Sequence, residues 1–267
     1  MKKIRLGVVG VGNMGASILE GVLAKRLTTP SRIWVYDVVE PRAKAFARRH
    51  GTGLAVSAAE LLKKTDVILL AMKPQDFVLF AEGNRSFFKP GQIVISILAG
   101  ATTEKIAKAL GKNVTVVRAM PNLGAKVSQS MTAICGKNKA ALSFASTLFS
   151  GCGEVVTLPE AKLDLVTAVS GSGPAYFFHL MELLADFGVR QGLSSKVAGV
   201  LAVQTGLGAA LLAKSSKESC GELRQRVTSK KGTTEAALKT LERKKFGAIF
   251  QSALKAAADR SRELRKG

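Results

Sequence analysis

Short apolar runs alternate with stretches of helical spacing over the first 159 residues of the chain. The runs at 4–9, 66–71 and 93–97 have the length of strands, and each contains at most one polar residue. Because strands of a parallel sheet are buried on both faces, such runs predict a parallel sheet. The stretches between them carry an apolar residue every three or four positions, which predicts helices packed on that sheet. The pattern therefore predicts a Rossmann-type doubly wound α/β domain over residues 1–159.

Smaller signals refine this first domain. Pro41 suits the first turn of a helix that ends near residue 50, and Ser57 with Glu60 predicts a capping box for the next helix. Two or so extra strands are expected at the end of the domain. The further strands are expected at 32–36, 54–56, 114–119, 131–135 and 154–158.

Strand signals stop after Pro159, and residues 160–267 predict an all-α second domain. Its helices are expected to break at 170–173, around 192, at 215–219 and at 228–232. The stretch 197–213 has no charge, but it falls below the roughly 20 residues that a membrane span needs. We therefore expect a helix buried in the core or in a subunit interface, and no membrane partner.

Composition narrows the class of protein. The three cysteines form no Cys-x-x-Cys pair, so we expect no metal site, no disulfide framework and a cytoplasmic location. The net charge of +21 is spread over both halves and suits an anionic cofactor. Because the chain has no recognised nucleic-acid module and few aromatic residues, we expect no specific nucleic-acid partner.

Residues 10–15 read Gly-Val-Gly-Asn-Met-Gly, between a predicted strand and a predicted helix. Gly10 suits the tight turn, Gly12 a close approach to a pyrophosphate, and Gly15 the packing of helix on strand. With Asn13 and Met14 these glycines predict a dinucleotide site at the N-terminus of the helix.

Asp37 ends the following strand, where an acidic residue binds the adenosine ribose. Its carboxylate would repel a 2′-phosphate and favours NADH on local chemistry. Arg42 and Lys44 would offset that repulsion, so the expected cofactor remains NADPH or NADH.

Polar residues follow two further strands at the same edge of the sheet, where ligands bind in such folds. Ala71 ends the strand at 66–71, Lys73 and Pro74 follow it, and Asn122 follows the strand at 114–119. Position favours a cofactor contact for Lys73. The Asn122 side chain suits a hydrogen bond to the ring or the carboxamide of a ligand. It equally suits a bond to the backbone of the turn that follows the strand.

Two helix starts in the second domain are rich in hydrogen-bond donors. The break at 170–173, which includes Ser172, exposes unpaired N–H groups to an anion. The stretch 227–238 reads VTSKKGTTEAAL, in which Gly232 allows an unusual backbone angle and Thr233 or Thr234 is expected to cap the helix. Such donors bind a carboxylate without a charged side chain, although a well-capped helix alone also explains them.

Together the stretches at 7–15, 71–75, 118–122, 169–176 and 222–242 resemble the pyrroline-5-carboxylate reductase family, essentially from end to end. The last stretch is the most specific, whereas many dehydrogenases share the first. The resemblance implies hydride transfer from NADPH or NADH to the C=N bond of 1-pyrroline-5-carboxylate, which gives L-proline. It also implies a helical domain that forms a homodimer or an oligomer of dimers, with the active site between the cofactor domain of one subunit and helical segments of the dimer.

The resemblance also assigns roles to single residues. Ser229, Gly232 and Thr233 would hold the substrate carboxylate, and Thr234 would hydrogen-bond the ring nitrogen. Lys73, Pro74 and Asn122 would line the nicotinamide end of the cofactor.

The chain departs from the family pattern in the loop before the two threonines and after Asn122. Lys231 replaces a glycine, and it either strains the loop, if φ is positive, or adds a cation near the carboxylate. Leu123-Gly124 stands where Thr-Pro is usual. These departures bear on substrate selectivity rather than on the type of reaction.

The absence of a catalytic acid or base agrees with this reaction, because an iminium ion accepts hydride without forming an alkoxide. A β-hydroxyacid dehydrogenase would need a lysine and an asparagine where this chain has Phe177 and Met181, neither of which transfers protons. A second hypothesis is a non-catalytic dinucleotide sensor or nucleic-acid-binding protein on a retained Rossmann fold, which the charge and Lys231 would suit.

Overall fold

The computed structural model describes residues 4–111 and 113–266, which form two compact units. Within these residues, the first unit holds the chain up to 171 and from 257 onward, and the second holds 172–256. The expected domain boundary after residue 159 remains a prediction. The compact unit extends beyond this point to Gly171, because a short helix and a π-helical turn pack with the sheet before the chain leaves it.

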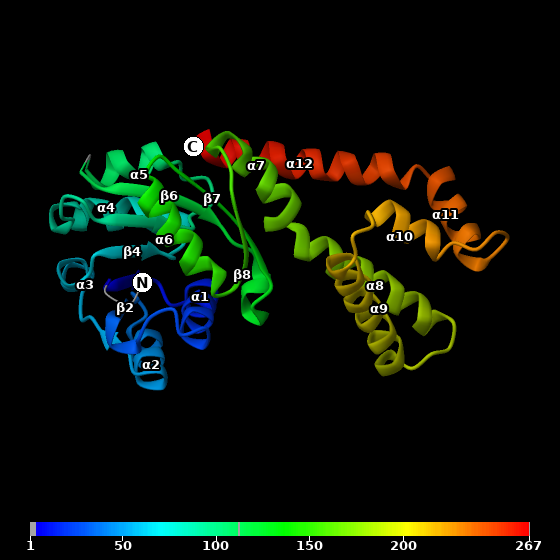
Figure 1. Ribbon diagram of the computed structural model, residues 1–267, viewed down its shortest axis with the longest axis horizontal. Coiled ribbons are helices and arrows are strands. Elements are labelled where there is room, and N and C mark those ends of the chain that lie inside the picture. Colours follow the sequence, from blue (N-terminus) through cyan, green and yellow to red (C-terminus); the bar gives the residue numbers. More distant parts are fainter. Residues whose placement is uncertain (1–3, 112, 267) are drawn as a thin grey trace. The chain divides into compact units, whose positions relative to one another are not determined.

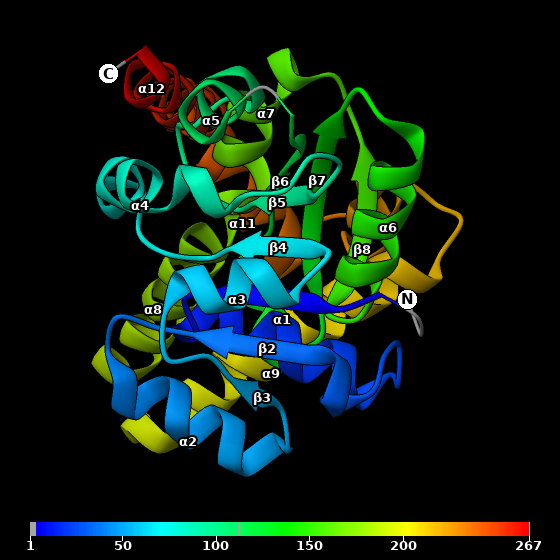
Figure 2. The same cartoon turned by 90° about the vertical axis from the view of Figure 1, so that its left-hand side faces the viewer.

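The first unit is built on one eight-stranded sheet of order β3-β2-β1-β4-β5-β6-β7-β8, shown in Figures 1 and 2. All neighbouring strands are parallel except β6 and β7, so the last two strands run opposite to the others. The predicted parallel sheet with extra strands at its end is confirmed. The strands are β1 (Leu6–Val9), β2 (Ile33–Tyr36), β3 (Gly53–Leu54), β4 (Val67–Leu70), β5 (Ile93–Ser96), β6 (Thr115–Met120), β7 (Ser130–Gly136) and β8 (Gly153–Thr157).

Helices cover both faces of this sheet, which explains the continuous apolar strands. In β4, Val67 and Leu69 join the core under α1, α2 and α6, whereas Ile68 and Leu70 join the core under α3, α4 and α5. Successive strand residues point to opposite faces, so every position in such a strand is buried. The helices of this unit are α1 (Asn13–Ala24), α2 (Glu40–His50), α3 (Ala58–Lys64), α4 (Phe77–Asn84), α5 (Thr103–Leu110), α6 (Lys139–Ser150) and α7 (Leu163–Val166).

The start of α3 differs from the expected capping box and shortens the strand before it. Ser57 Oγ accepts the N–H of Glu60 at 3.2 Å, as predicted. The Glu60 carboxylate, however, accepts the N–H of Val56 at 2.7 Å rather than that of Ser57. Because Val56 is used in this cap, β3 ends at Leu54 and not at residue 56.

The final turns of the C-terminal helix α12 (Phe246–Lys266) belong to the first unit. There, the Ser261 hydroxyl donates to the buried carboxylate of Asp164 in α7 at 2.9 Å. Arg265 Nη1 lies 3.4 Å from the other oxygen of the same carboxylate. A buried acid with these partners ties the end of the chain to the sheet domain.

The second unit is entirely helical in the described residues, as predicted. Close contacts at glycines hold α8 against α9, for example Gly206 beside the Met181 methyl group and Gly188 beside Ala198. One further break, with Lys245 at φ +57°, separates α11 from α12 and was not predicted. The helices here are α8 (Gly173–Arg190), α9 (Ser195–Ser215), α10 (Cys220–Arg226), α11 (Thr233–Arg243) and the first part of α12.

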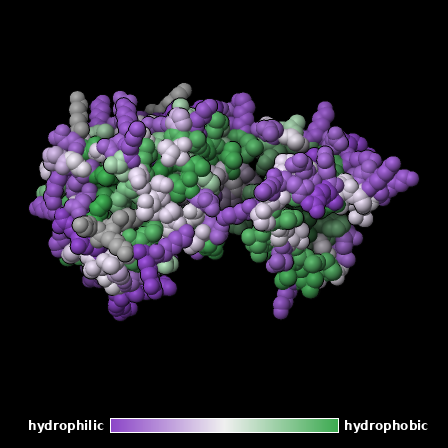
Figure 3. Space-filling model, in the orientation of Figure 1, coloured by the Kyte–Doolittle hydropathy of each residue, from purple (hydrophilic) through white to green (hydrophobic). Residues whose placement is uncertain are grey.

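Much of the apolar surface of α8 and α9 is exposed, and Figure 3 shows hydrophobic side chains gathered there. Phe177, Phe187 and Val200 are each more than 60% exposed. The helix expected to be buried in the core or in a subunit interface is therefore not a core helix of the single chain, which buries only Ala198 and Ala202 of α9. By length and composition alone, α9 is also apolar enough to cross a membrane.

Candidate dinucleotide site and donor-rich loops

The glycine-rich turn joins the end of β1 to the start of α1, as its spacing predicts. Gly10 has φ +97°, and a Cβ there would lie 2.7 Å from the carbonyl oxygen of Ala71. A Cβ on Gly15 would lie 2.1 Å from the carbonyl oxygen of Gly10. Both positions require glycine, because the clashing atoms belong to the backbone.

The N-terminus of α1 is open to a ligand. Its N-cap is Gly12, which supplies no side-chain cap for the first N–H groups of the helix. The nearest atom to a Cβ on Gly12 is Arg42 Nη1 at 4.0 Å, so no backbone crowds this position. Unpaired N–H groups and the positive end of the helix dipole make this turn suitable for a diphosphate.

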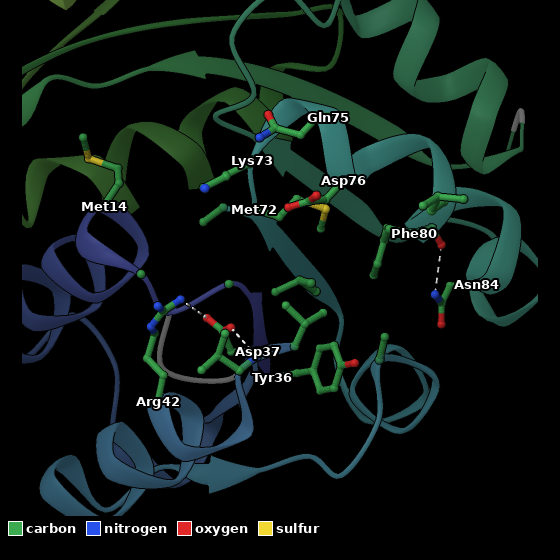
Figure 4. A pocket seen from close by; sticks show the side chains of 18 of the residues that line it. Met14, Tyr36, Asp37, Arg42, Met72, Lys73, Gln75, Asp76, Phe80 and Asn84 are labelled. Carbon is green, nitrogen blue, oxygen red and sulfur yellow. Dashed lines mark hydrogen bonds and ion pairs between the residues drawn. The ribbon is translucent and has the colours of Figure 1, made fainter.

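Asp37 holds this turn as well as facing the pocket (Figure 4). Its two carboxylate oxygens accept the N–H groups of Val11 and Val39, each at 2.9 Å. Arg42 Nη1 lies 3.5 Å from Oδ2. The side chain is only 4% exposed, so Asp37 links β2 to the glycine-rich turn and also fixes a cation at the pocket.

A pocket of about 850 Å³ extends from this turn across the carboxyl edge of the sheet. Of the predicted cofactor residues, it is lined by Gly10, Gly12, Asn13, Met14, Asp37, Ala71 and Lys73. Gly15 and Pro74 shape neighbouring backbone without lining it, and Asn122 lies elsewhere at the sheet edge.

Several lining residues were not predicted, although two of them had a signal in the sequence. Tyr36 directly precedes Asp37 on β2, and Gln75 directly follows Pro74. Phe80 and Asn84 come from α4, where the Asn84 amide donates to the Phe80 carbonyl at 2.9 Å. The sequence alone does not reveal which face of α4 meets the pocket.

Lys44 does not share the position of Arg42. Its ammonium group lies 2.7 Å from the Glu40 carboxylate on the same helix, and it does not line the pocket. Of the two cations expected to offset repulsion of a 2′-phosphate, only Arg42 is therefore placed to do so.

Asn122 is engaged with protein backbone at the end of β6. Its side-chain oxygen accepts the N–H of Gly124 at 3.1 Å, and its side-chain nitrogen donates to the Ser170 carbonyl at 2.9 Å. The turn interpretation of Asn122 thus has a geometric basis. Its contact with the cofactor remains a prediction.

The loop before α11 and the first turn of that helix contain Ser229, Gly232, Thr233 and Thr234, whereas the fifth predicted substrate residue, Ser172, lies at the start of α8. Gly232 packs against Ser229 so closely that a Cβ would lie 2.2 Å from Ser229 Oγ. Gly232 itself is the N-cap, with φ −83° and no side-chain cap, so the prediction of a threonine cap and an unusual angle at this glycine is wrong. Thr233 and Thr234 instead occupy the first two helical positions, which leaves their hydroxyls free of a capping role.

Lys231 carries the positive φ of this loop, at +60°. Its N–H donates to the Glu235 carboxylate at 2.6 Å, and Lys239 Nζ lies 3.1 Å from the same carboxylate. The Lys239 hydrogen bond, followed by that from Lys231, lowers the pKa of Glu235 below its usual value. The chain therefore retains a strained lysine where the loop geometry favours glycine.

Ser172 precedes the first residue of α8 and supplies no side-chain cap, and Pro174 occupies the first turn, as predicted. The N-terminus of α8 therefore leaves N–H groups without a side-chain cap. Whether Ser172 meets the substrate remains a prediction.

The chain matches two protein families, each over a different part of its length. Residues 160–264 match the family described as pyrroline-5-carboxylate reductase dimerisation, and residues 5–100 match the family described as NADP oxidoreductase, coenzyme F420-dependent. These matches follow the helical part and the glycine-rich part of the chain.

Relatives that match over nearly the whole chain include several pyrroline-5-carboxylate reductases. The chain is 40% identical to a pyrroline-5-carboxylate reductase of Pseudomonas aeruginosa, over 99% of this chain and 98% of that protein. It is similar to the structure of a pyrroline-5-carboxylate reductase from Coxiella burnetii, with a TM-score of 0.92, 34% identity and 99% of each chain covered. The Plasmodium falciparum pyrroline carboxylate reductase with NADP bound gives a TM-score of 0.88 at 26% identity, again with 99% of each chain covered.

Proposed function

The chain belongs to the pyrroline-5-carboxylate reductase family, and we propose that its loop at 229–234 is where the substrate of that reaction binds. It is an NAD(P)H-dependent oxidoreductase of proline biosynthesis, which reduces the C=N bond of 1-pyrroline-5-carboxylate to give L-proline. The fold and the reaction expected from the sequence are thus confirmed. The roles of single residues are our proposal.

The geometry of the glycine-rich turn supports cofactor binding there. The uncapped start of α1 and the glycines that leave it open fit a diphosphate, and Asp37 with Arg42 fits an adenosine ribose. We assign the nicotinamide end to Lys73 and Pro74. When bound, the reduced nicotinamide supplies the hydride.

The substrate carboxylate is held, in this proposal, by Ser229, Gly232 and Thr233. The observation that carries it is the N-terminus of α11, where Gly232 caps the helix without a side chain and the Ser229 hydroxyl lies against it. Free backbone N–H groups and hydroxyls bind a carboxylate without a titrating group. Ser172, at the start of α8, is assigned a supporting contact.

We assign Thr234 the hydrogen bond with the ring nitrogen of the substrate. The C=N carbon of a protonated imine is already electrophilic, so hydride addition leaves a neutral amine and no alkoxide. The protein then has to orient the ring: backbone N–H groups donate to the carboxylate, and the Thr234 hydroxyl oxygen accepts the N–H of the protonated ring nitrogen, so no protein group changes its protonation. Thr234 and Ser229 are therefore the catalytic residues of the proposal.

A homodimer explains the exposed apolar surface of α8 and α9. The match to a dimerisation family spans both helices, and the exposed side chains are too numerous for an isolated soluble unit. We therefore assign α9 to a subunit interface rather than to a membrane, and the protein to the cytoplasm. A larger oligomer of dimers is a further part of the proposal. Light scattering of the purified protein tests it, and a monomer at micromolar concentration would contradict it.

The reaction is tested by following oxidation of NADPH and of NADH with 1-pyrroline-5-carboxylate. We expect turnover with at least one cofactor and formation of L-proline. No turnover with either cofactor, together with tight and salt-sensitive binding to DNA, would favour the alternative of a non-catalytic binding protein.

A further inference from the structure

Both ends of the Asn122 side-chain amide are bonded to the protein backbone. Its Oδ1 accepts the N–H groups of Gly124, at 3.1 Å, and of Met131, at 3.4 Å. An NH₂ group cannot accept from two N–H donors, so these contacts determine which end of the amide is the oxygen. Nδ2 therefore points the other way and donates to the carbonyl oxygen of Ser170 at 2.9 Å.

A second contact joins the same two segments. A Cβ built on Gly171 would lie 2.7 Å from Met120 Cε, so the end of the Met120 side chain occupies the space beside this glycine. Met120 and Asn122 lie at the end of β6, and Ser170 and Gly171 end the π-helical turn Thr167–Gly171. A hydrogen bond and a packing contact thus hold this turn against the edge of the sheet.

The π-helical turn leads directly into Ser172 and the start of α8. Its widened geometry interrupts the regular ladder of helical hydrogen bonds, which is frequent at functional sites. The donors offered to an anion here are backbone N–H groups, and their direction follows the backbone rather than a side-chain rotamer. The bond to the Ser170 carbonyl therefore fixes the peptide plane that joins Ser170 to Gly171, and with it the path of the backbone into Ser172.

We propose that Asn122 is a positioning residue for the substrate segment at 170–173, and that its amide acts through the Ser170 carbonyl. This inference rests on the proposed function, because it takes that segment as part of the substrate site. It changes the role expected for Asn122 from a cofactor contact to a support of the substrate backbone.

The test compares Asn122→Asp with the wild-type dimer. Aspartate keeps an acceptor for Gly124 and Met131 but replaces the donor to Ser170 with a second acceptor. We expect the KM for 1-pyrroline-5-carboxylate to rise about tenfold, the loss expected for one hydrogen bond. The Kd of NADPH or NADH, measured by fluorescence titration without substrate, is expected to change less than about twofold.

Asn138→Asp is the matched control, because Asn138 caps α6 through its side-chain oxygen and aspartate serves equally well there. It adds the same charge to the same unit and is expected to leave KM unchanged. A weaker cofactor Kd with an unchanged KM in Asn122→Asp would overturn the proposal and make Asn122 a cofactor contact. Unchanged KM and Kd would overturn it as well.

A third measurement does not depend on turnover. Amide hydrogen exchange of residues 170–173, followed without substrate, is expected to accelerate in Asn122→Asp and not in Asn138→Asp. Equal exchange in the wild type and Asn122→Asp would overturn the proposal, whereas a wild type without turnover would contradict only the proposed function.

Discussion

Arg42 Nη1 lies 3.5 Å from the buried carboxylate of Asp37, at the pocket beside the glycine-rich turn. The same carboxylate accepts the N–H groups of Val11 and Val39. Asp37 therefore has two opposite effects on the binding of a cofactor with a 2′-phosphate. Its charge repels a 2′-phosphate, yet it holds in place Arg42, a cation that lines the pocket and attracts such a group.

We predict that Arg42→Ala lowers kcat/KM for NADPH about tenfold more than kcat/KM for NADH. Only NADPH carries the 2′-phosphate, so the hydrogen bond between the guanidinium and that phosphate is lost with NADPH alone. Steady-state kinetics with both cofactors measures the ratio. Lys44→Ala is the control, because Lys44 pairs with Glu40 and does not line the pocket. An equal change for both cofactors in Arg42→Ala would show that this residue does not face the 2′ position.

Asp37→Ser is predicted to shift preference toward NADPH, because the repelling charge is removed. The structure adds a second expectation. A serine is too short to bond Val11 and Val39 together, so both cofactors are expected to bind more weakly. An unaltered ratio of kcat/KM for the two cofactors would place the adenosine ribose away from residue 37.

Thr234→Ala is predicted to lower kcat/KM for 1-pyrroline-5-carboxylate by about ten- to a hundredfold, the loss of a hydrogen bond to a charged group. The Kd of the cofactor should stay within about twofold of the wild type. Thr240→Ala on the same helix is the control, because its hydroxyl bonds only the carbonyl of Ala236 in its own helix. Wild-type rates in Thr234→Ala would remove this residue from the mechanism.

Lys231→Gly is predicted to raise the free energy of unfolding by about 0.5–1 kcal/mol, since glycine adopts φ +60° without steric cost but loses more entropy on folding. Urea unfolding measures the change. Lys230→Gly is the neighbouring control; Lys230 is not among the described residues with positive φ, and it is expected to gain no stability. If KM for the substrate rises in Lys231→Gly but not in Lys230→Gly, then the Lys231 cation also assists carboxylate binding.

Asp66 and Arg5 give a pH dependence of stability. The side-chain hydrogen bond from Arg5 lowers the pKa of the Asp66 carboxyl below its usual value of 3.8. A lowered folded pKa stabilises the protein above that value, and this stability is lost as pH falls through the folded pKa. Because both side chains are more than 40% exposed, solvent screening limits the effect to below about 1 kcal/mol. Asp66→Asn should therefore lower Tm near neutral pH, and its Tm should approach that of the wild type as the pH falls through the lowered pKa of Asp66; a difference in Tm that does not shrink on acidification would exclude this origin.

The strands and the glycine-rich turn could be predicted because their signals are local. A run such as 67–70 is apolar throughout because it is buried on both faces. Its consecutive apolar residues are therefore visible in the sequence. Gly10 and Gly15 are required by contacts within the turn and with Ala71, which directly follows β4. The helix starts at Gly173, just before Pro174, and at Thr233 were predicted for the same reason, although residues 170–171 of the first expected break lie in a π-helical turn. The break at Lys244–Lys245 contains neither glycine nor proline.

By itself, the amino-acid sequence determined the class of fold, the dinucleotide turn and the family, since these depend on short motifs and on periodicity. Only the tertiary structure decided that the Asn122 amide bonds the Ser170 carbonyl, that Arg42 rather than Lys44 lines the pocket, and that Gly232 rather than a threonine caps α11. Each of these outcomes is a choice of partner among groups that the sequence leaves equally able to bond. The partner is decided by the distance and direction between the groups, which are set only when the sheet and its helices have packed.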